Sequence, residues 1–528
     1  MSNHAYESAA ALRPSSNGPI PISTLCERFS LTPASAEDAA ALNDLSTLGV
    51  SVDSGDTAAG ELFVGLPGFT VHGARFAAEA VASGAVAVLT DSDGAQIVHE
   101  SAPGTPVLVH GDPRAIVGPL SAEAYHHPAR GLITTAVTGT NGKTTTAYFL
   151  DAILSAHVGG CMVAGTVELR VGERSVESPR TTVEAPVLQR MMALAVEDKV
   201  GAASLEASSH AIVLHRLDGI VVDVAGFTNL QRDHLDFHKT MEGYLEAKAQ
   251  LFTPEHARRG VVCVDDQWGA TLAAEAPIEI DRVRAYPGDT PADWWVSDAA
   301  VSLTDSATTF TLHGPDGEQI EASCPLPGLV NVQNAALALV MAIRAGVPAA
   351  TAAAALAGAH NIPGRMQRIS QRDGRRGLCI VDFAHTPEAM ELALKAVRPI
   401  TPGRLIVVFG SDGDRDQGKR PMLGEVCARL ADVLVVTDEN PRSEDPQLIR
   451  NAILEGVRGV RPDLTDVEEI TTWRGDAVRR GVELCGPDDT VIVTGKGHEP
   501  FLEMAGEFIR YNDAPVMAEA VEEKWGRA

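Results

Sequence analysis

The sequence predicts an α/β protein of three domains, in which a central P-loop ATPase-type parallel sheet is followed by a C-terminal doubly wound, Rossmann-like sheet. Three observations support this fold class. Short apolar runs rich in β-branched residues alternate with helical patterns along most of the chain. The stretch AVTGTNGKTTTAYFL (136–150) places a glycine-rich turn between a strand and a helix. In the last third of the chain, apolar strands end in polar residues, as they do where doubly wound sheets bind ligands.

The composition is that of an acidic, globular protein. The 528 residues are 45% hydrophobic and include 43 Lys and Arg but 70 Asp and Glu, a formal net charge of −27. This charge favours solubility and argues against a nucleic-acid partner. The seven cysteines are scattered without a CxxC pair, and no uncharged apolar run reaches the roughly 18 residues of a membrane span. We therefore expect a cytoplasmic, monomeric protein with no membrane or nucleic-acid partner.

The first part of the chain is predicted to contain a disordered tail and a small α/β domain. Residues 1–20 are small, polar and proline-containing, which is typical of disorder. Residues 21–130 form the N-terminal domain, because Pro128 and Gly131 in YHHPARG interrupt the periodicity at its end. Its expected strands and helix are GELFVGL (60–66), GARFAAEAVASG (73–84), AVAVLT (85–90) and TPVLVH (105–110).

The middle domain, residues 131–361, begins with a loop suited to phosphate. LITTAVTG (132–139) predicts a strand and TTTAYFLDAILSAH (144–157) a helix, so the loop between them lies where a helix N-terminus can bind an anion. Val137 stands where the standard P-loop pattern has glycine, which makes this a shortened relative of that loop. Further strands are expected at 202–209, 220–230 and 259–266, and helices at 334–345 and 349–358.

The C-terminal domain, residues 362–528, starts after the break at Pro363 and Gly364 and repeats the alternation clearly. Its expected strands are LCIVDFAHT (378–386), RLIVVFGS (404–411), DVLVVTDEN (432–440) and DTVIVTGKG (489–497). Because ligands of such sheets gather beyond the carboxyl ends of the strands, the polar residues there are candidate contacts. They are His385, Asp412, Arg415, Asp438, Asn440, Lys496 and Glu499.

Several polar residues of the middle domain suggest chemistry. Lys143 and Thr144 supply the ammonium and hydroxyl of a phosphate and metal site, and Glu206 ends the apolar strand in LEASSH (205–210) with a carboxylate suited to Mg²⁺. A pair between Glu206 and an arginine is the alternative. In TNLQRDHLDFH (228–238), His234 and His238 are compatible with a zinc half-site or with solvated loop residues.

Lys248 lies in YLEAKAQLF (244–252), a semi-apolar helical stretch, where a surface salt bridge would be the ordinary interpretation. At this point the chain resembles the Mur ligases, ATP-dependent amide-forming enzymes of bacterial cell-wall synthesis. The similar stretches occur in the order of that family. They are TGTNGKTT (138–145), LEASSHAIVLHRL (205–217), FTNLQRDHLDFH (227–238), YLEAKAQLF, GLVNVQNAALAL (328–339), VDFAHTPEAM (381–390), FGSDGDRDQGKRP (409–421) and TDENPRSEDP (437–446).

The resemblance implies an ATP site and two Mg²⁺ ions. Lys248 would be carbamylated by CO₂, and the carbamate, with His234, would hold the second ion, while Thr144 and Glu206 hold the first. Lys143, Lys248 and His234 would be the catalytic residues. The implied ATP contacts are Thr138, Gly139, Thr140, Asn141, Gly142, Lys143, Thr144, Asn334, Asp382 and His385.

The resemblance also implies binding sites for a UDP-muramoyl-peptide and an amino acid. The nucleotide-sugar contacts would be Ser54, Thr181, Thr182, Ser208 and Arg216, and the amino-acid contacts Arg415, Asn440, Arg442, Gly495 and Glu499. The chain departs from the family at Gly55, where arginine is usual, and at Leu214, where a relative has glutamine. Relatives that add meso-diaminopimelate carry Asp-Asn-Pro-Arg, whose arginine pairs with the distal carboxylate. Here the segment is ENPR, Glu439 to Arg442.

The implied reaction is the addition of meso-diaminopimelate to the γ-carboxylate of D-Glu in UDP-N-acetylmuramoyl-L-Ala-D-Glu. ATP would phosphorylate that carboxylate, and the amine would attack the acyl phosphate and release phosphate. Three alternatives stay open. The ligase could add L-lysine or another diamino acid, the chain could be another ligase of this superfamily such as a folylpolyglutamate synthase, or it could be a P-loop NTPase switch without ligase activity.

Overall fold

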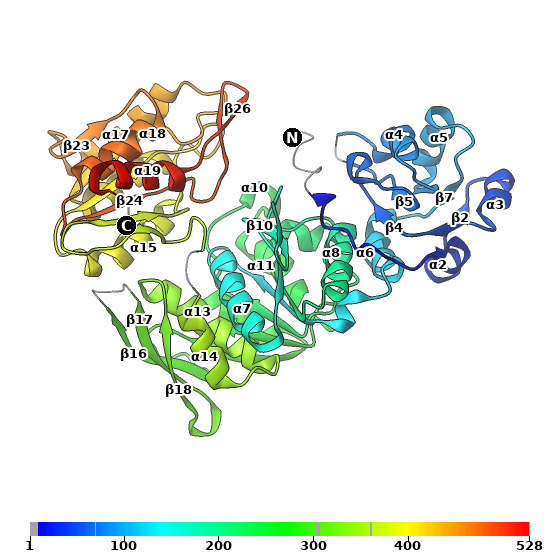
Figure 1. Cartoon of the computed structure of the whole chain (residues 1–528), viewed down its shortest axis with the longest axis horizontal. Coiled ribbons are helices and arrows are strands. Elements are labelled where there is room, and N and C mark those ends of the chain that lie inside the picture. The colour runs from blue at the N-terminus through cyan, green and yellow to red at the C-terminus, as the bar shows by residue number, and fades with distance from the viewer. Residues whose placement is uncertain (1–8, 69, 303–306, 360–361, 527–528) are drawn as a thin grey trace. The chain divides into compact units, whose positions relative to one another are not determined.

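The computed structural model describes residues 9–68, 70–302, 307–359 and 362–526 (Figure 1). The chain divides into two compact units, residues 1–295 with 336–355 and residues 296–335 with 356–528. This division does not follow the three predicted domains, whose boundaries at 20/21, 130/131 and 361/362 stay predictions. The predicted α/β fold class, with a mainly parallel central sheet and a second parallel sheet near the C-terminus, is confirmed.

The N-terminal domain is a five-stranded sheet of order β2-β7-β6-β5-β4, in which only the short β2 is antiparallel to its neighbour. Alternate residues of β5 serve two cores, because Leu62 and Val64 join one hydrophobic cluster and Phe63 joins the other. The strands are β2 (Thr32–Pro33), β4 (Gly49–Ser51), β5 (Glu61–Val64), β6 (Ala87–Thr90) and β7 (Val107–Val109), and the helices are α2 (Ile22–Phe29), α3 (Ala36–Leu42), α4 (Ala77–Ala82), α5 (Ser92–Ser101) and α6 (Pro113–Ala124).

The sheet of the middle domain has the order β11-β10-β9-β12-β8-β13-β14-β15 within the first unit, with β9, β12, β8, β13, β14 and β15 parallel. An antiparallel pair, β10 and β11, extends one edge. The strands are β8 (Ile133–Thr138), β9 (Cys161–Ala164), β10 (Glu168–Val171), β11 (Arg174–Glu177), β12 (Ala202–Glu206), β13 (Val224–Phe227), β14 (Arg259–Cys263) and β15 (Glu279–Arg284).

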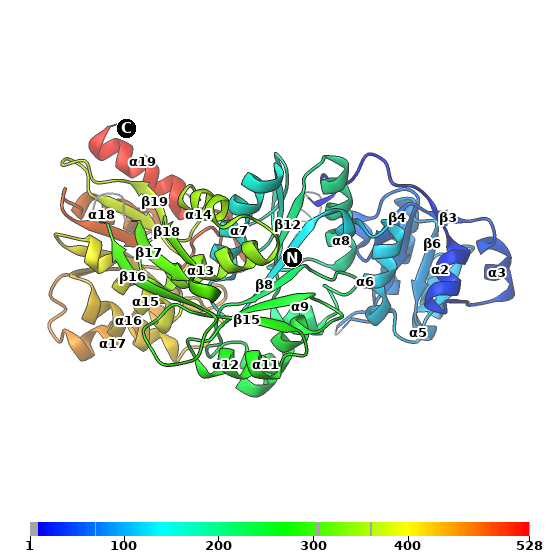
Figure 2. The same ribbon diagram turned by 90° about the horizontal axis from the view of Figure 1, so that it is seen from below.

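Strand register brings the predicted site residues of the middle domain to one edge. Glu206 at the end of β12 pairs with Val137 of β8, and Phe227 at the end of β13 pairs with Thr138. The segments that follow three neighbouring strands therefore leave the sheet together. The helices are α7 (Lys143–Val158), α8 (Ala185–Glu197), α9 (Ser209–Val213), α10 (Leu235–His238), α11 (Met241–Ala249), α12 (Gln267–Glu275), α13 (Leu329–Arg344) and α14 (Ala349–Ala357), with α11 beside α9 and α12 (Figure 2).

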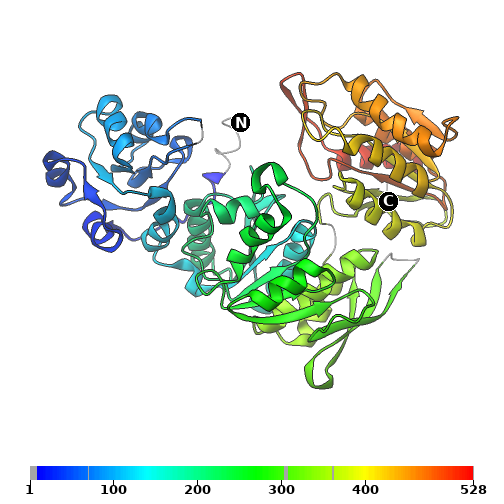
Figure 3. The same cartoon turned by 180° about the vertical axis from the view of Figure 1, so that it is seen from behind.

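The C-terminal sheet has the order β19-β20-β24-β21-β22-β23, and all its strands except the edge strand β19 run parallel. Helices cover both faces (Figure 3), as expected for a doubly wound sheet. The elements are β19 (Gln367–Ser370), β20 (Leu378–Val381), α15 (Pro387–Val397), β21 (Leu405–Phe409), α16 (Lys419–Leu430), β22 (Val433–Val436), α17 (Pro446–Val460), β23 (Val467–Glu469), α18 (Arg474–Leu484), β24 (Thr490–Val493) and α19 (Asp513–Trp525).

The second unit also contains two antiparallel hairpins. The hairpins are β17 (Thr308–His313) with β18 (Gln319–Cys324), and β25 (Phe501–Met504) with β26 (Glu507–Arg510). All seven cysteines are free thiols. No helix of the described residues is long and apolar enough to cross a membrane.

Part of the segment predicted to be disordered is packed. Leu12 is buried, and Arg13 pairs with the buried carboxylates of Asp56 and Glu61. Asp56 also accepts from Arg190 of α8 at 2.8 Å, and Arg190 donates to the carbonyl of Ala9 at 2.9 Å. Composition could not reveal these long-range partners, so order begins by residue 9, while residues 1–8 of the predicted tail lie outside the described residues.

The Arg190–Asp56 pair gives a prediction about stability. Arg190→Ala should lower the free energy of unfolding by about 3–5 kcal/mol, because it leaves a buried carboxylate with one cation fewer. Chemical denaturation followed by circular dichroism measures this. Arg174→Ala is the matched control, because Arg174 is 50% exposed in its pair with Asp198. This change should lower the free energy of unfolding by less than about 1 kcal/mol. Equal losses in the two variants would contradict the prediction.

Candidate functional site

The predicted phosphate loop joins the end of β8 to the start of α7. Gly139 has φ of +142°, and a Cβ there would lie 1.9 Å from the hydroxyl oxygen of Thr228, so only glycine fits. Asn141 is held from both ends, because its backbone N–H donates to Asn229 Oδ1 at 3.1 Å and its side chain donates to Gln231 at 2.8 Å. The loop is therefore fixed to the segment that follows β13.

Lys143 begins α7 and turns back over the loop. Its ammonium donates to the carbonyl oxygens of Gly139 at 3.0 Å and Thr140 at 2.9 Å. Both carbonyls belong to the loop that would surround a phosphate, so the charge already lies at the expected place. A bound phosphate would offer this ammonium stronger acceptors than neutral carbonyls do.

Glu206 is buried beside the loop at 1% exposure. It accepts from the hydroxyls of Thr144 and Thr166, each at 3.0 Å, and from the backbone N–H of Thr166 at 2.8 Å. Among the described residues it has no ion-pair partner, so the alternative of an arginine pair is not supported. A buried carboxylate beside hydroxyl oxygens, without a cation of its own, fits a hard divalent ion such as Mg²⁺.

Lys248 is not a surface residue. Its side chain is buried on α11, donates to the carbonyl of Gly139 at 2.9 Å and lies 4.4 Å from the ring centre of Tyr244. Burial, followed by the charge of Lys143, holds the pKa of Lys248 well below its usual value. The interpretation as a surface salt bridge is therefore wrong, because the residue lies under the loop as an amine of reduced basicity.

Two histidine rings, those of His234 and His238, lie near the ring of Tyr244. His238 stacks on that ring with 4.9 Å between centroids and bonds to the hydroxyl of Ser209 at 2.8 Å. His234 has φ of +53°, is half exposed and lies 3.4 Å from Asp233. The described residues contain no group of three or more His, Cys, Asp or Glu side chains that could hold a metal ion, so the zinc alternative gains no support.

Three arginines from separate segments meet at the carboxylate of Glu184. Arg114 of α6 is 2.8 Å from it, Arg216 is 3.0 Å from it, and Arg180 is 3.3 Å from it. Three positive charges on one carboxylate leave the cluster positive, which suits a polyanionic ligand. Of these residues only Arg216 was predicted as a contact. Arg114 becomes a neighbour of Glu184 only through the fold, whereas Arg180 lies four residues before it.

The remaining residues predicted for the nucleotide-sugar divide into two places. Thr182 donates to the carbonyl of Glu206 at 2.7 Å and accepts from the backbone N–H of Ser208 at 3.0 Å, and its own carbonyl accepts from Arg216 at 3.1 Å. Thr181 accepts from the hydroxyl of Thr166 at 3.2 Å. These residues therefore link the arginine cluster to Glu206. Ser54 is separate and donates to Glu79 at 2.8 Å within the N-terminal domain.

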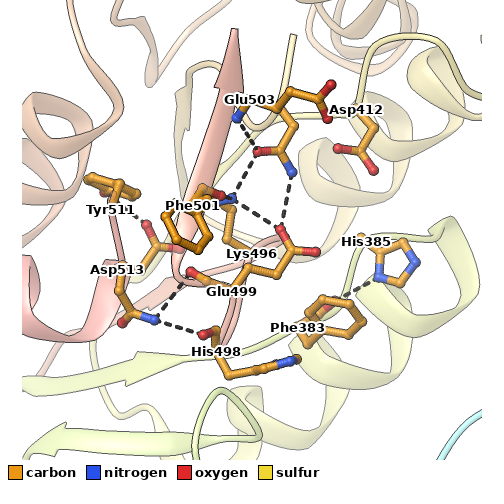
Figure 4. A network of polar contacts seen from close by, with 12 residues as sticks. Phe383, His385, Asp412, Lys496, His498, Glu499, Phe501, Glu503, Tyr511 and Asp513 are labelled. Carbon is orange, nitrogen blue, oxygen red and sulfur yellow. Dashed lines mark hydrogen bonds and ion pairs between the residues drawn. The ribbon is translucent and has the colours of Figure 1, made fainter. Parts of the chain in front are cut away.

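In the second unit, the residues predicted for adenine and ribose lie after β20. Asp382 accepts from the backbone N–H groups of Met366 and Ala384, and burial raises its pKa. His385 bonds to the carbonyl of Phe383, whose ring lies 5.4 Å from that of His498 (Figure 4). The Oδ1 atom of Asn334, on α13, is buried without a hydrogen-bond partner among the described residues.

The residues predicted for the amino acid gather around Lys496, whose side chain is buried. Its ammonium donates to Asn440 at 2.9 Å, to Glu499 at 3.1 Å and to the carbonyl of Phe501 at 2.6 Å (Figure 4). Arg442 lies at the same strand edge and pairs with Glu503 at 3.0 Å. Arg415, also predicted, is exposed on the loop after β21. Lys496 was predicted as a candidate contact at a strand end, but it was not among the residues assigned to the amino acid.

Glu439 stands where the resemblance described above has aspartate, and it lies against Gly495. A Cβ on Gly495, whose φ is +108°, would lie 2.5 Å from Glu439 Oε2, so glycine makes room for the longer acid. Glu439 Oε2 and Asp412 Oδ1 are buried without hydrogen-bond partners among the described residues. Burial, with the charge of Asp412, raises the pKa of Glu439 to about 8. This edge therefore offers acidic oxygens to an incoming ammonium group.

Comparison with known proteins gives a consistent result over nearly the whole chain. Residues 48–117 match the catalytic domain of the Mur ligase family, residues 137–342 the Mur ligase middle domain, and residues 364–497 the Mur ligase glutamate ligase domain. The chain is 43% identical over 483 residues to UDP-N-acetylmuramoyl-L-alanyl-D-glutamate--2,6-diaminopimelate ligase of Streptomyces avermitilis, which covers 92% of this chain and 94% of that protein.

Two further relatives agree. UDP-N-acetylmuramyl-tripeptide synthetase of Leifsonia xyli subsp. xyli is 42% identical over 508 residues, covering 95% of this chain and 96% of that protein. A solved structure of a UDP-N-acetylmuramoyl-L-alanyl-D-glutamate--2,6-diaminopimelate ligase is similar with a TM-score of 0.64 and 31% identity, covering 91% of this chain and 95% of that one.

The raised pKa of Glu439 gives a prediction about pH. Between its ordinary value of 4.5 and about 8, the folded state holds a proton that the unfolded state releases, so this group costs stability as pH rises through that window. From pH 5.5 to 8, the free energy of unfolding of wild type should fall by about 2–3 kcal/mol relative to that of Glu439→Gln. Denaturation at the two pH values measures this, with Glu425→Gln on the surface of α16 as control. An unchanged difference between wild type and Glu439→Gln would contradict it.

Proposed function

Because the chain belongs to the Mur ligase family, we propose that it joins meso-diaminopimelate to the γ-carboxylate of D-Glu in UDP-N-acetylmuramoyl-L-Ala-D-Glu. The reaction forms one amide bond and converts ATP to ADP and phosphate. The observation that carries the proposal is the placing of Lys143, Glu206 and Lys248 around one glycine-rich loop, with both Glu206 and Lys248 buried. We also propose that the protein is cytoplasmic and monomeric and that its partners are small molecules only.

In this mechanism the loop holds the phosphates of ATP. The ammonium of Lys143 exchanges its bonds to the loop carbonyls for bonds to phosphate oxygens and stabilises the charge that develops as the γ-phosphoryl group moves. The D-Glu carboxylate takes that group and becomes an acyl phosphate. The amine of the diamino acid then attacks the acyl carbon, and phosphate leaves.

Thr144 and Glu206 would hold one Mg²⁺, and His234 and a carbamate on Lys248 a second. The ions supply positive charge that neutralises the phosphates. Lys248 is suited to carbamylation because its buried amine has reduced basicity, and CO₂ adds to neutral amines. The neutral amine forms a bond to the carbon of CO₂ and releases a proton, and the resulting carboxylate would attract Lys143.

The arginines around Glu184 suit the diphosphate of the nucleotide-sugar, since they are the positive cluster described beside Thr182 and Ser208. In the second unit, Asn440, Glu499 and Gly495 would receive the amino acid, and Arg442 its distal carboxylate. Asp412 and Glu439 present acidic oxygens at the same edge, which favours a substrate with two ammonium groups.

The two lysines near the loop provide a first test. Lys143→Ala and Lys248→Ala should each lower ligase activity by at least about 100-fold at saturating ATP. The first removes an ammonium from the phosphate site, and the second removes the proposed carbamate ligand of Mg²⁺. Product mass and phosphate release measure this, with Lys395→Ala on the exposed side of α15 as control. Full activity in either lysine variant would contradict the mechanism. Incorporation of ¹³C-labelled CO₂ into wild type and not into Lys248→Ala tests the carbamate separately.

The acceptor provides a second test. With ATP, Mg²⁺ and UDP-N-acetylmuramoyl-L-Ala-D-Glu, the enzyme should prefer meso-diaminopimelate to L-lysine, and Arg442→Ala should reduce that preference by about 10-fold or more. A preference for L-lysine would keep the ligase and change its amino acid. Phosphate release that does not depend on the muramoyl peptide would support an NTPase switch instead.

A further inference from the structure

The hairpin formed by β25 and β26 is joined to Arg442 by its backbone. The N–H of Arg442 donates to the carbonyl of Glu503 at 3.0 Å, and the N–H of Ala505 donates to the carbonyl of Arg442 at 2.7 Å. Arg442 also forms an isolated parallel bridge with Met504 and has φ of +54°. The side chain of Glu503 is therefore delivered to Arg442 by main-chain contacts that do not depend on the charge of either residue.

The guanidinium of Arg442 lies between two protein carboxylates. Its Nη1 atom is 3.0 Å from Glu503, and its Nη2 atom is 4.0 Å from Asp412. Its Nε atom is buried without a hydrogen-bond partner among the described residues. Figure 4 shows Glu503 and Asp412 near the network of Lys496, and the backbone N–H of Glu503 donates to Asn440 Oδ1 at 3.2 Å. Glu503 thus belongs to the edge that the proposed function assigns to the amino acid.

This arrangement has a consequence for substrate choice. A substrate carboxylate that approaches Arg442 meets a guanidinium already neutralised by Glu503, and must displace or share that partner. A substrate without the carboxylate leaves Arg442 paired, so its binding does not leave this partly buried cation without a partner. Glu503 therefore weakens discrimination between diamino acids with and without a distal carboxylate.

We propose that Glu503 is a specificity-determining residue, which competes with the distal carboxylate of the incoming amino acid for Arg442. This rests on the proposed function, since it concerns the same amino-acid site. Its role is separate from that of Arg442. Arg442 attracts the substrate carboxylate, whereas Glu503 weakens this attraction by pairing with Arg442.

The test compares Glu503→Gln with wild type by steady-state kinetics, using meso-diaminopimelate and L-lysine as acceptors at saturating ATP and muramoyl peptide. Glutamine preserves the size and the backbone contacts but removes the competing charge. The KM for meso-diaminopimelate should fall about 3- to 10-fold while kcat changes less than about twofold, and the KM for L-lysine should not fall. Glu503→Asp, with a shorter reach to Arg442, should give an intermediate ratio.

Glu507→Gln on exposed β26 of the same hairpin is the control and should leave both KM values unchanged. An equal change for both substrates in Glu503→Gln, or no change for either, would overturn the proposal, and matching thermal midpoints would show that the variant is folded. If wild type ligates neither amino acid, the proposed function fails. If wild type ligates an amino acid but the ratio of the KM values for meso-diaminopimelate and L-lysine is the same in Glu503→Gln, only the proposed role of Glu503 fails.

Discussion

Two lysine side chains donate to one carbonyl oxygen, that of Gly139, and the candidate phosphate site depends on this contact. Lys143 reaches it from the start of α7 and Lys248 from α11, at 3.0 and 2.9 Å. Burial is the main reason why the pKa of Lys248 is lowered, and the charge of Lys143 at the same acceptor lowers it further. Gly139 itself can approach only because it lacks a side chain, since Thr228 occupies the space beside it. Backbone geometry thus provides the hydrogen-bond acceptor for a side chain more than a hundred residues away.

Most of the fold could be predicted from the sequence because its strands are continuous apolar runs, as buried parallel strands must be. β21 and β24 lie inside the predicted runs 404–411 and 489–497, and β8 lies inside 132–139. The predicted helix 73–84 is instead a short 3₁₀ turn, Gly73–Phe76, followed by α4. What periodicity could not supply were partners distant in sequence. Arg114, for example, meets Glu184 from α6, which is distant in the sequence, and nothing local marks this arginine.

The candidate site was predictable to a different degree in its two halves. Around the loop, the order of glycine, lysine and threonine already indicated the chemistry, and the burial of Glu206 added the missing physical reason for a metal. At the amino-acid end, ENPR indicated an arginine but could not show that Glu503 already pairs with it. Two relatives of nearly equal identity carry names of different detail, one specifying diaminopimelate and one only a tripeptide synthetase. Overall identity is therefore a coarse guide to substrate.

The packed segment before α2 affects how the molecule can be divided. Leu12 and Arg13 precede the first helix of the N-terminal domain, yet Leu12 is buried and Arg13 pairs with Asp56, which also pairs with Arg190 of the middle domain. If residues 21–130 were exchanged between relatives, the arm formed by Leu12 and Arg13 would be separated from its own partners, Asp56 and Glu61. The N-terminal domain is therefore not a self-contained cassette. Its natural unit of exchange includes the arm and the face of α8 against which both are packed.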